Sequence, residues 1–81
     1  MPKIVYFKSV FWPRCSNTDR LLEGVRVARP GVEIETIEIL EHPRRVLRDH
    51  VRMIPLIMIN DRRWYQAPPV QEILTALDGD A

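Results

Sequence analysis

The stretch that decides the fold is Trp12-Pro13-Arg14-Cys15, which follows the unbroken apolar run Ile4-Val5-Tyr6-Phe7. An apolar run that does not alternate is typical of a strand buried on both faces, so residues 3–8 are predicted to form a central strand. From Cys15 onward, apolar and small residues recur at spacings of three and four, which predicts a helix packed on one side. Pro30-Gly31 ends that helix. The tetrapeptide therefore lies at a strand-to-helix turn.

The middle of the chain continues the alternation of strand and helix. Residues 32–40 alternate apolar and acidic side chains with one change of phase at Thr36, which predicts a half-exposed edge strand with either a bulge or a change of exposed face there. His42-Pro43 then opens a short helix, since proline is well tolerated in a first turn. The predicted buried stripe of this helix consists of Val46, Leu47 and Val51.

The last third predicts a hairpin and a final helix. Leu56 to Ile59 form a second continuous apolar run, and the turn Asn60-Asp61 leads into a short antiparallel strand at residues 63–65. Residues 70–77 show helical spacing. The predicted class is α/β with the order βαβαββα, a mixed four-stranded sheet flanked by three helices within a single domain, residues 1–81.

Composition limits the possible functions. The chain has 81 residues and a formal net charge of +1, and its acidic residues are interspersed with the basic ones, so a nucleic-acid partner is not expected. Cys15 is the single cysteine, which excludes an internal disulfide framework and indicates a reducing, cytoplasmic setting. No segment has the length or the apolar character of a signal peptide or a membrane span.

Histidines and arginines crowd into the segment around residues 42–52. The arginines are Arg44, Arg45, Arg48 and Arg52. A solvated helix face explains them most simply, and an anion-binding surface for an acidic partner is the alternative. His42 and His50 have no carboxylates at ligand spacing, so no metal site is expected.

The motif at residues 12–15, the element order and the segment Val51-Arg52-Met53-Ile54-Pro55 together resemble the thioredoxin superfamily, most closely a small glutaredoxin-like redoxin. Pro13 and Cys15 match the last three places of Cys-Pro-x-Cys, and Trp12 occupies the place of the nucleophilic cysteine. The resemblance implies a cis Pro55 beside the active-site loop, with the Ile54 backbone exposed to an extended thiol peptide. Met53 and Pro13 would help to shape that groove.

The resemblance also implies limits on glutathione binding. Lys8 is the candidate for the basic residue that glutaredoxins carry before the motif, although it is one residue further away than usual. Gln66-Ala67-Pro68-Pro69 stands where the family has paired glycines. Glutathione is therefore expected only as a co-substrate, and no resident cofactor is expected.

Cys15 has two interpretations. In the first turn of a helix, with Arg14 beside it, a cysteine is favoured as a thiolate, whereas a thiol buried among apolar groups is inert. A single thiol can form a mixed disulfide, but an external thiol or a second subunit must resolve it, so classical dithiol activity is not expected.

Trp12 is open to three interpretations. It is a gate or a flat contact for a bound peptide, or a loop aromatic packed on Trp64, Tyr65 or Pro68. The third concerns the gene: tryptophan and cysteine codons flank the stop codon that some organisms translate as selenocysteine, so position 12 could stand for selenocysteine or cysteine.

Two function classes follow from these residues. The first is thiol–disulfide exchange and electron transport through Cys15, acting on a protein thiol or disulfide, by a monomer or weak homodimer. The alternative is a redox-inactive binding module of the same fold, in which Trp12 and Ile54-Pro55 recognise a protein partner. An exposed edge strand would permit dimerisation.

Overall fold

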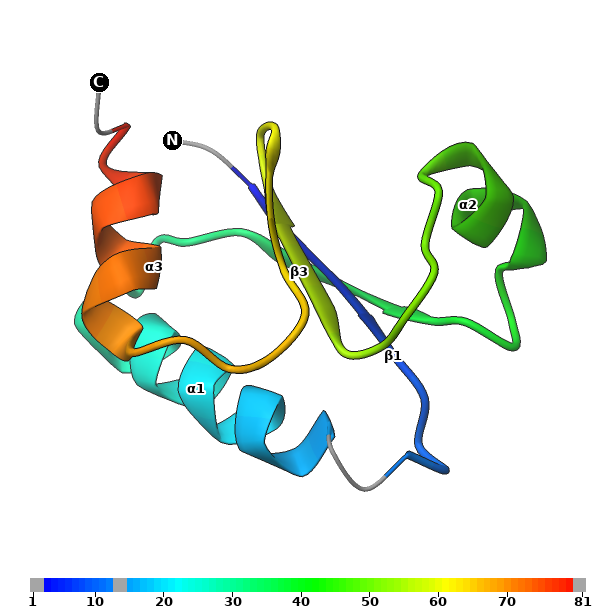
Figure 1. Cartoon of the computed structure of the whole chain (residues 1–81). Helices are drawn as coiled ribbons and strands as arrows, with labels where there is room; N and C mark the ends of the chain where they lie inside the picture. The colour runs from blue at the N-terminus through cyan, green and yellow to red at the C-terminus, as the bar shows by residue number, and fades with distance from the viewer. Residues whose placement is uncertain (1–2, 13–14, 80–81) are drawn as a thin grey trace.

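The computed structural model describes residues 3–12 and 15–79. Four strands and three helices follow one another in the predicted order (Figure 1). They are β1 (Ile4–Lys8), α1 (Cys15–Ala28), β2 (Ile34–Glu38), α2 (Pro43–Arg48), β3 (Leu56–Ile59), β4 (Arg62–Trp64) and α3 (Val70–Leu77). The α/β class and the mixed four-stranded sheet are confirmed.

The sheet has the strand order β2-β1-β3-β4. β1 pairs parallel with β2, with Ile4 opposite Ile34, and antiparallel with β3, with Ile4 opposite Ile59. β4 closes the other edge as an antiparallel hairpin partner of β3. The two continuous apolar runs therefore form the two central strands, because only those strands are covered on both faces.

Two apolar clusters lie on opposite faces of this sheet, and β1 contributes alternate residues to each. Ile4 and Tyr6 belong to the larger cluster, which α1 and α3 cover, and Phe7 belongs to the smaller one. Figure 1 shows α1 and α3 together on one side and α2 well apart on the other. Cys15 heads α1 at the end of the molecule where β1 stops and β3 starts.

Helix α2 departs from the prediction. It buries no residue, and Leu47, expected in its buried stripe, is 77% exposed. The helix ends at Arg48, and His50 adopts a left-handed φ of 54°, so the helical phase is lost before Val51. Val51 packs against the smaller cluster from outside the helix, which leaves Leu47 facing solvent.

Strand β2 resolves the change of phase at Thr36. It spans five residues, and its pairing with β1 runs without a break from Ile34 to Glu38, so the strand has no bulge. Ile34 packs against the larger cluster and Ile37 belongs to the smaller one, so the apolar side chains change face there, as the other alternative predicted. The place of β2 at the sheet edge is confirmed. Among the described residues, no helix is both long and apolar enough to cross a bilayer.

Candidate functional site

Cys15 is the first residue of α1, and a turn holds it close to Trp12. Its backbone N–H donates to the Trp12 carbonyl over 3.1 Å. The residue is only 2% exposed. The sulfur is therefore covered in this structure, whereas Trp12, predicted to stand at the position of the family's nucleophile, is 45% exposed. Pro13 and Arg14, the other predicted residues of the motif, lie outside the described residues.

A polar network joins the start of α1 to β1. The hydroxyl of Tyr6 lies 3.1 Å from the Cys15 carbonyl oxygen and 2.9 Å from Oδ1 of Asp19. Burial, followed by the hydrogen bond to Asp19, raises the pKa of Tyr6 well above its ordinary value, so the hydroxyl keeps its proton. Lys8 completes the network with its Nζ 3.0 Å from Oδ2 of Asp19.

This network occupies Lys8, one of the predicted site residues. Lys8, predicted to bind substrate, is ion-paired with Asp19, and its side chain is 21% exposed. The Asp19 carboxylate accepts hydrogen bonds from both Tyr6 and Lys8, so it joins α1 to β1. Lys8 therefore fixes helix against strand, and its charge is largely used inside the molecule.

The loop before β3 carries the other half of the predicted site. The Ile54–Pro55 peptide bond is cis, and Pro55 is buried. Ile54 and Met53 border a pocket of about 390 Å³ whose walls are almost entirely apolar. Its lining consists of Ser9, Phe11, Trp12, Ile39, Arg52, Met53 and Ile54.

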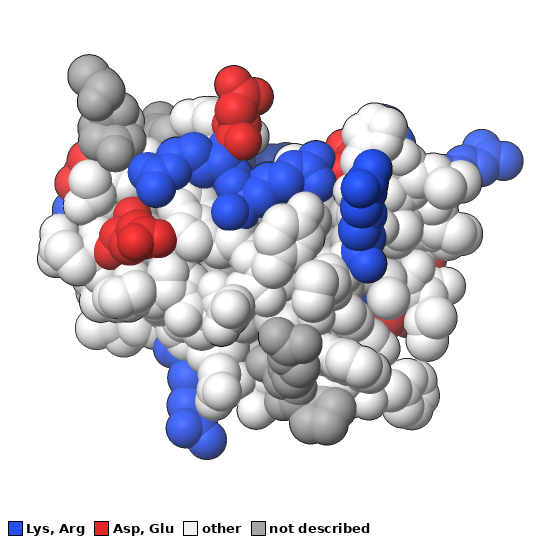
Figure 2. Space-filling view, in the orientation of Figure 1, with Lys and Arg blue, Asp and Glu red and all other residues white. Residues whose placement is uncertain are grey.

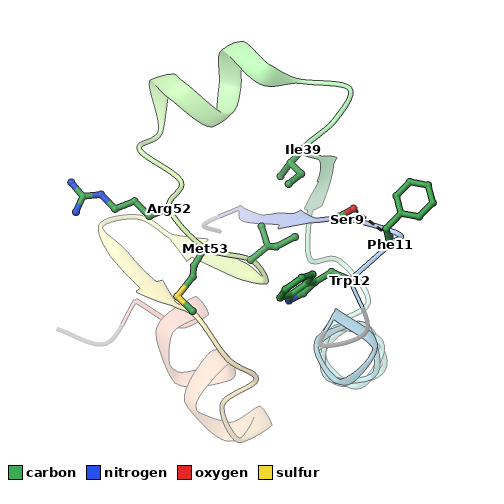
Figure 3. Close-up of a pocket in the computed structure, with 7 residues that line it drawn as sticks. Ser9, Phe11, Trp12, Ile39, Arg52 and Met53 are labelled. Atoms are coloured by element: carbon green, nitrogen blue, oxygen red, sulfur yellow. Dashed lines mark hydrogen bonds between the residues drawn. The ribbon is translucent and has the colours of Figure 1, made fainter.

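Figure 3 shows how these side chains are placed. The Trp12 indole reaches into the space between the loop that carries Met53 and the loop that carries Ile39. Phe11 and Arg52 extend outward on opposite sides. Trp12 and Met53, predicted as site residues on opposite loops, are thus brought to the same pocket.

A second depression lies on the other side of the proline loop. Asn17, Pro55, Gln66 and Ala67 line it, with a volume of about 190 Å³. Since Asn17 belongs to the first turn of α1, this depression places the cis proline beside the helix start that carries Cys15. The loop of the motif and the proline loop therefore form one continuous surface.

The aromatic residues on which Trp12 could pack, Trp64 and Tyr65, have other packing partners. Trp64 packs against the larger cluster, and its indole N–H donates to Glu72. Tyr65 packs against the smaller cluster. Trp12 instead lines the pocket beside Ile54, so the structure favours an aromatic available for contact over one packed on Trp64.

Sequence reasoning missed three exposed apolar residues, one that lines this pocket and two that directly adjoin a lining residue in the chain. Val10, Phe11 and Leu40 are 73%, 78% and 66% exposed. The signal that could have found the first two is the apolar run that continues past the end of β1 into a loop, where polar residues are usual. For Leu40 the sequence offers only an apolar residue directly before a charged turn.

Metal binding has no support in the described part of the chain. No group of three or more His, Cys, Asp or Glu side chains there could hold a metal ion.

Comparison with known proteins decides the family. No protein-family model matches the chain. A thioredoxin of Methanocaldococcus jannaschii is 32% identical over 73 residues, which cover 89% of this chain and 86% of that protein. The chain belongs to the thioredoxin superfamily. Membership makes it a redox-type thioredoxin-fold protein, a class that acts on protein thiols and generally needs no cofactor.

Solved structures agree on the fold of this thioredoxin-superfamily protein. Reduced desulfothioredoxin from Desulfovibrio vulgaris Hildenborough matches with a TM-score of 0.79 at 16% identity, covering 96% of this chain and 80% of that one. Thioredoxin 1 from Thermosipho africanus gives 0.75 at 21% identity, with 95% and 91% covered. Oxidised mitochondrial thioredoxin 3 from Saccharomyces cerevisiae gives 0.79 at 16%, with 95% and 77% covered.

Proposed function

We propose that the protein exchanges thiols and disulfides with an extended protein substrate through Cys15. The observation that carries the proposal is the adjacency of the cis-proline loop and the first turn of α1, since Pro55 and Asn17 line the same depression. A peptide laid over Ile54 and Pro55 would pass beside the helix start. The backbone of that loop offers hydrogen bonds to such a peptide, as strand addition requires.

The exchange needs one thiolate and an external thiol. The Cys15 sulfur, after losing its proton to solvent, attacks one sulfur of the substrate disulfide and forms a mixed disulfide. The second substrate sulfur leaves as a thiolate with the electron pair of the broken bond. A small external thiol such as glutathione then attacks the mixed disulfide at the substrate sulfur, releases Cys15 as thiolate and forms a new disulfide with the substrate. Because Cys15 is 2% exposed, the groups that cover it must move before the first step.

Intact mass tests this function directly. Reduced protein is incubated with oxidised glutathione at neutral pH, and Cys15→Ser serves as the control. We expect an adduct of one glutathione on the wild-type chain and none on the control. A thiol that stays unmodified until the protein is denatured would contradict exchange through Cys15.

The second candidate is a redox-inactive binding module, and the burial of Cys15 favours it. In that case the apolar pocket beside Trp12 and Ile54 binds a protein partner and the sulfur only packs. The mass experiment separates the two candidates, since a binding module leaves Cys15 unmodified in the folded state. The glutaredoxin-like subtype, the single domain spanning 1–81, monomer or weak homodimer, and a cytoplasmic location stay predictions.

A further inference from the structure

Five exposed apolar side chains, which either line the pocket or directly adjoin a lining residue in the chain, form what we call the apolar lip. They are Val10, Phe11, Trp12, Leu40 and Met53, each between 45% and 78% exposed. They come from three loops: the one after β1, the one after β2 and the one before β3. Solvent-exposed apolar groups gathered in this way mark an interaction site more often than a free surface.

The lip is held in place before any partner arrives. The Glu38 carboxylate accepts hydrogen bonds from the backbone N–H of Val10, at 2.8 Å, and of Leu40, at 3.1 Å. These two bonds lower the pKa of Glu38, so it stays ionised at neutral pH. They tie the first two loops together. A preformed surface loses less conformational entropy on binding than a mobile one.

Positive charge lies beside the lip. The segment 38–54 holds four arginines against three acids, Glu38, Glu41 and Asp49. Asp49 is already paired with Arg45 and Arg48. Arg52 lines the pocket and is exposed, and no ion pair is recorded for it in the part of the chain that the structure describes. Figure 3 shows its side chain running outward from the rim.

The surface view shows an uncharged region next to a region where positive charges gather. In Figure 2 the lower right of the face, where β1 ends and β3 starts, is mostly uncharged. Lys and Arg side chains gather above it, toward the β3–β4 hairpin and α2. An occupant of the lip that extends in that direction meets cations.

We propose that the apolar lip binds an extended peptide with a large apolar side chain flanked by acidic residues. This inference rests on the proposed function, because it names the substrate class of the same site. The apolar side chain enters the pocket of about 390 Å³, and the flanking carboxylates face Arg52, the arginine that lines this pocket. Charge complementarity determines which peptides bind more than it determines how tightly they bind. Exposed ion pairs add little affinity, whereas like charges repel each other.

Fluorescence anisotropy with labelled, cysteine-free peptides tests the inference. Three short peptides are compared on the wild-type protein: phenylalanine between glutamates, phenylalanine between lysines, and alanine between glutamates. We expect the first to bind most tightly, with at least about a tenfold loss of affinity when alanine replaces phenylalanine, since the aromatic side chain would no longer be buried in the pocket. Salt at molar concentration should reduce the difference in affinity between the two phenylalanine peptides.

Two matched charge-reversal variants test whether Arg52 causes the preference for acidic peptides. Arg52→Glu should lower the affinity for the peptide with phenylalanine between glutamates about fivefold. Arg26→Glu, at the far end of α1, should leave its affinity unchanged. Equal binding of the acidic and basic peptides, or no binding of either, would overturn the inference. The inference would also be overturned if the protein self-associates and Phe11→Ser abolishes that association, because the lip would then be the interface between two copies. Since the peptides lack cysteine, a failure of exchange through Cys15 does not affect this readout.

Discussion

At the scale of single residues, the exposed position and the reactive atom are on different side chains. Trp12, predicted to stand at the place of the family's nucleophile, is 45% exposed, and Cys15, which carries the sulfur, is 2% exposed. An apolar aromatic at the rim adds contact area to the pocket, whereas it removes the group that starts exchange in the family. We therefore expect this residue pair to favour contact with a partner over dithiol chemistry.

Trp12→Cys should restore an internal dithiol. The backbone hydrogen bond from Cys15 N–H to the Trp12 carbonyl spans three residues, a turn in which the end Cα atoms lie within about 7 Å. Disulfides join Cα atoms over about 4.4–6.8 Å. We therefore expect Trp12→Cys to lose two hydrogens in mass under mild oxidant, while the double variant with Cys15→Ser does not.

The same variant also tests how the chain is aligned with the family. Oxidised Trp12→Cys protein should resist alkylation, and a mild reductant should make both thiols available again. If only intermolecular dimers form under oxidant, the turn does not bring positions 12 and 15 into disulfide geometry. The assignment of the motif would then be wrong.

At the scale of secondary-structure elements, α2 contributes little to the core. Leu47→Ala should change the free energy of unfolding by no more than about 0.5 kcal/mol, because its side chain is 77% exposed. Leu56→Ala, on central strand β3, removes a side chain with 0% exposure and should cost about 2–5 kcal/mol. Urea unfolding of the two leucine variants measures both values. A large loss for Leu47→Ala would mean that α2 packs in solution as the sequence pattern predicted.

The elements could be predicted from sequence because each has a strong local signal. Two unbroken apolar runs, such as Leu56 to Ile59, identify central strands, and Pro43 and Pro69 mark helix starts. The buried side of α2 could not be predicted. A six-residue helix has too few positions to define a face, and the left-handed residue His50 breaks the phase.

The site was only partly predictable for a related reason. The proline loop and Cys15 have a recognisable pattern, so the sequence placed them together. The ion pair of Lys8 with Asp19 joins residues eleven apart on a strand and a helix. Glu38 likewise binds the backbone of Val10, twenty-eight residues away. Such pairings depend on how elements dock, which periodicity does not contain.

At the scale of the whole molecule, Glu35 links parts that are distant in sequence. From edge strand β2 it accepts hydrogen bonds from Arg45 of α2 at 3.0 and 3.2 Å, and its carboxylate lies 3.1 Å from the Lys3 ammonium, just before β1. The hydrogen bonds from Arg45, followed by Lys3, lower the pKa of Glu35 from 4.5 to about 2. Helix α2, with no buried residue, is held partly by this contact.

The lowered pKa of Glu35 predicts how the stability of the fold depends on pH. A carboxyl whose pKa is lower in the folded state stabilises the fold fully above its unfolded pKa, 4.5, and the contribution is lost as pH falls toward about 2. Glu35→Gln should therefore lower the urea midpoint at neutral pH and flatten its decline over that acidic range. Partial exposure of the pair to solvent keeps the effect modest. Glu33→Gln is the matched control, since Glu33 is exposed and has no recorded ion pair within residues 3–12 and 15–79. Midpoints of wild type and Glu35→Gln that decline in parallel from pH 4.5 to 2 would show that Glu35 does not link α2 to the sheet in solution.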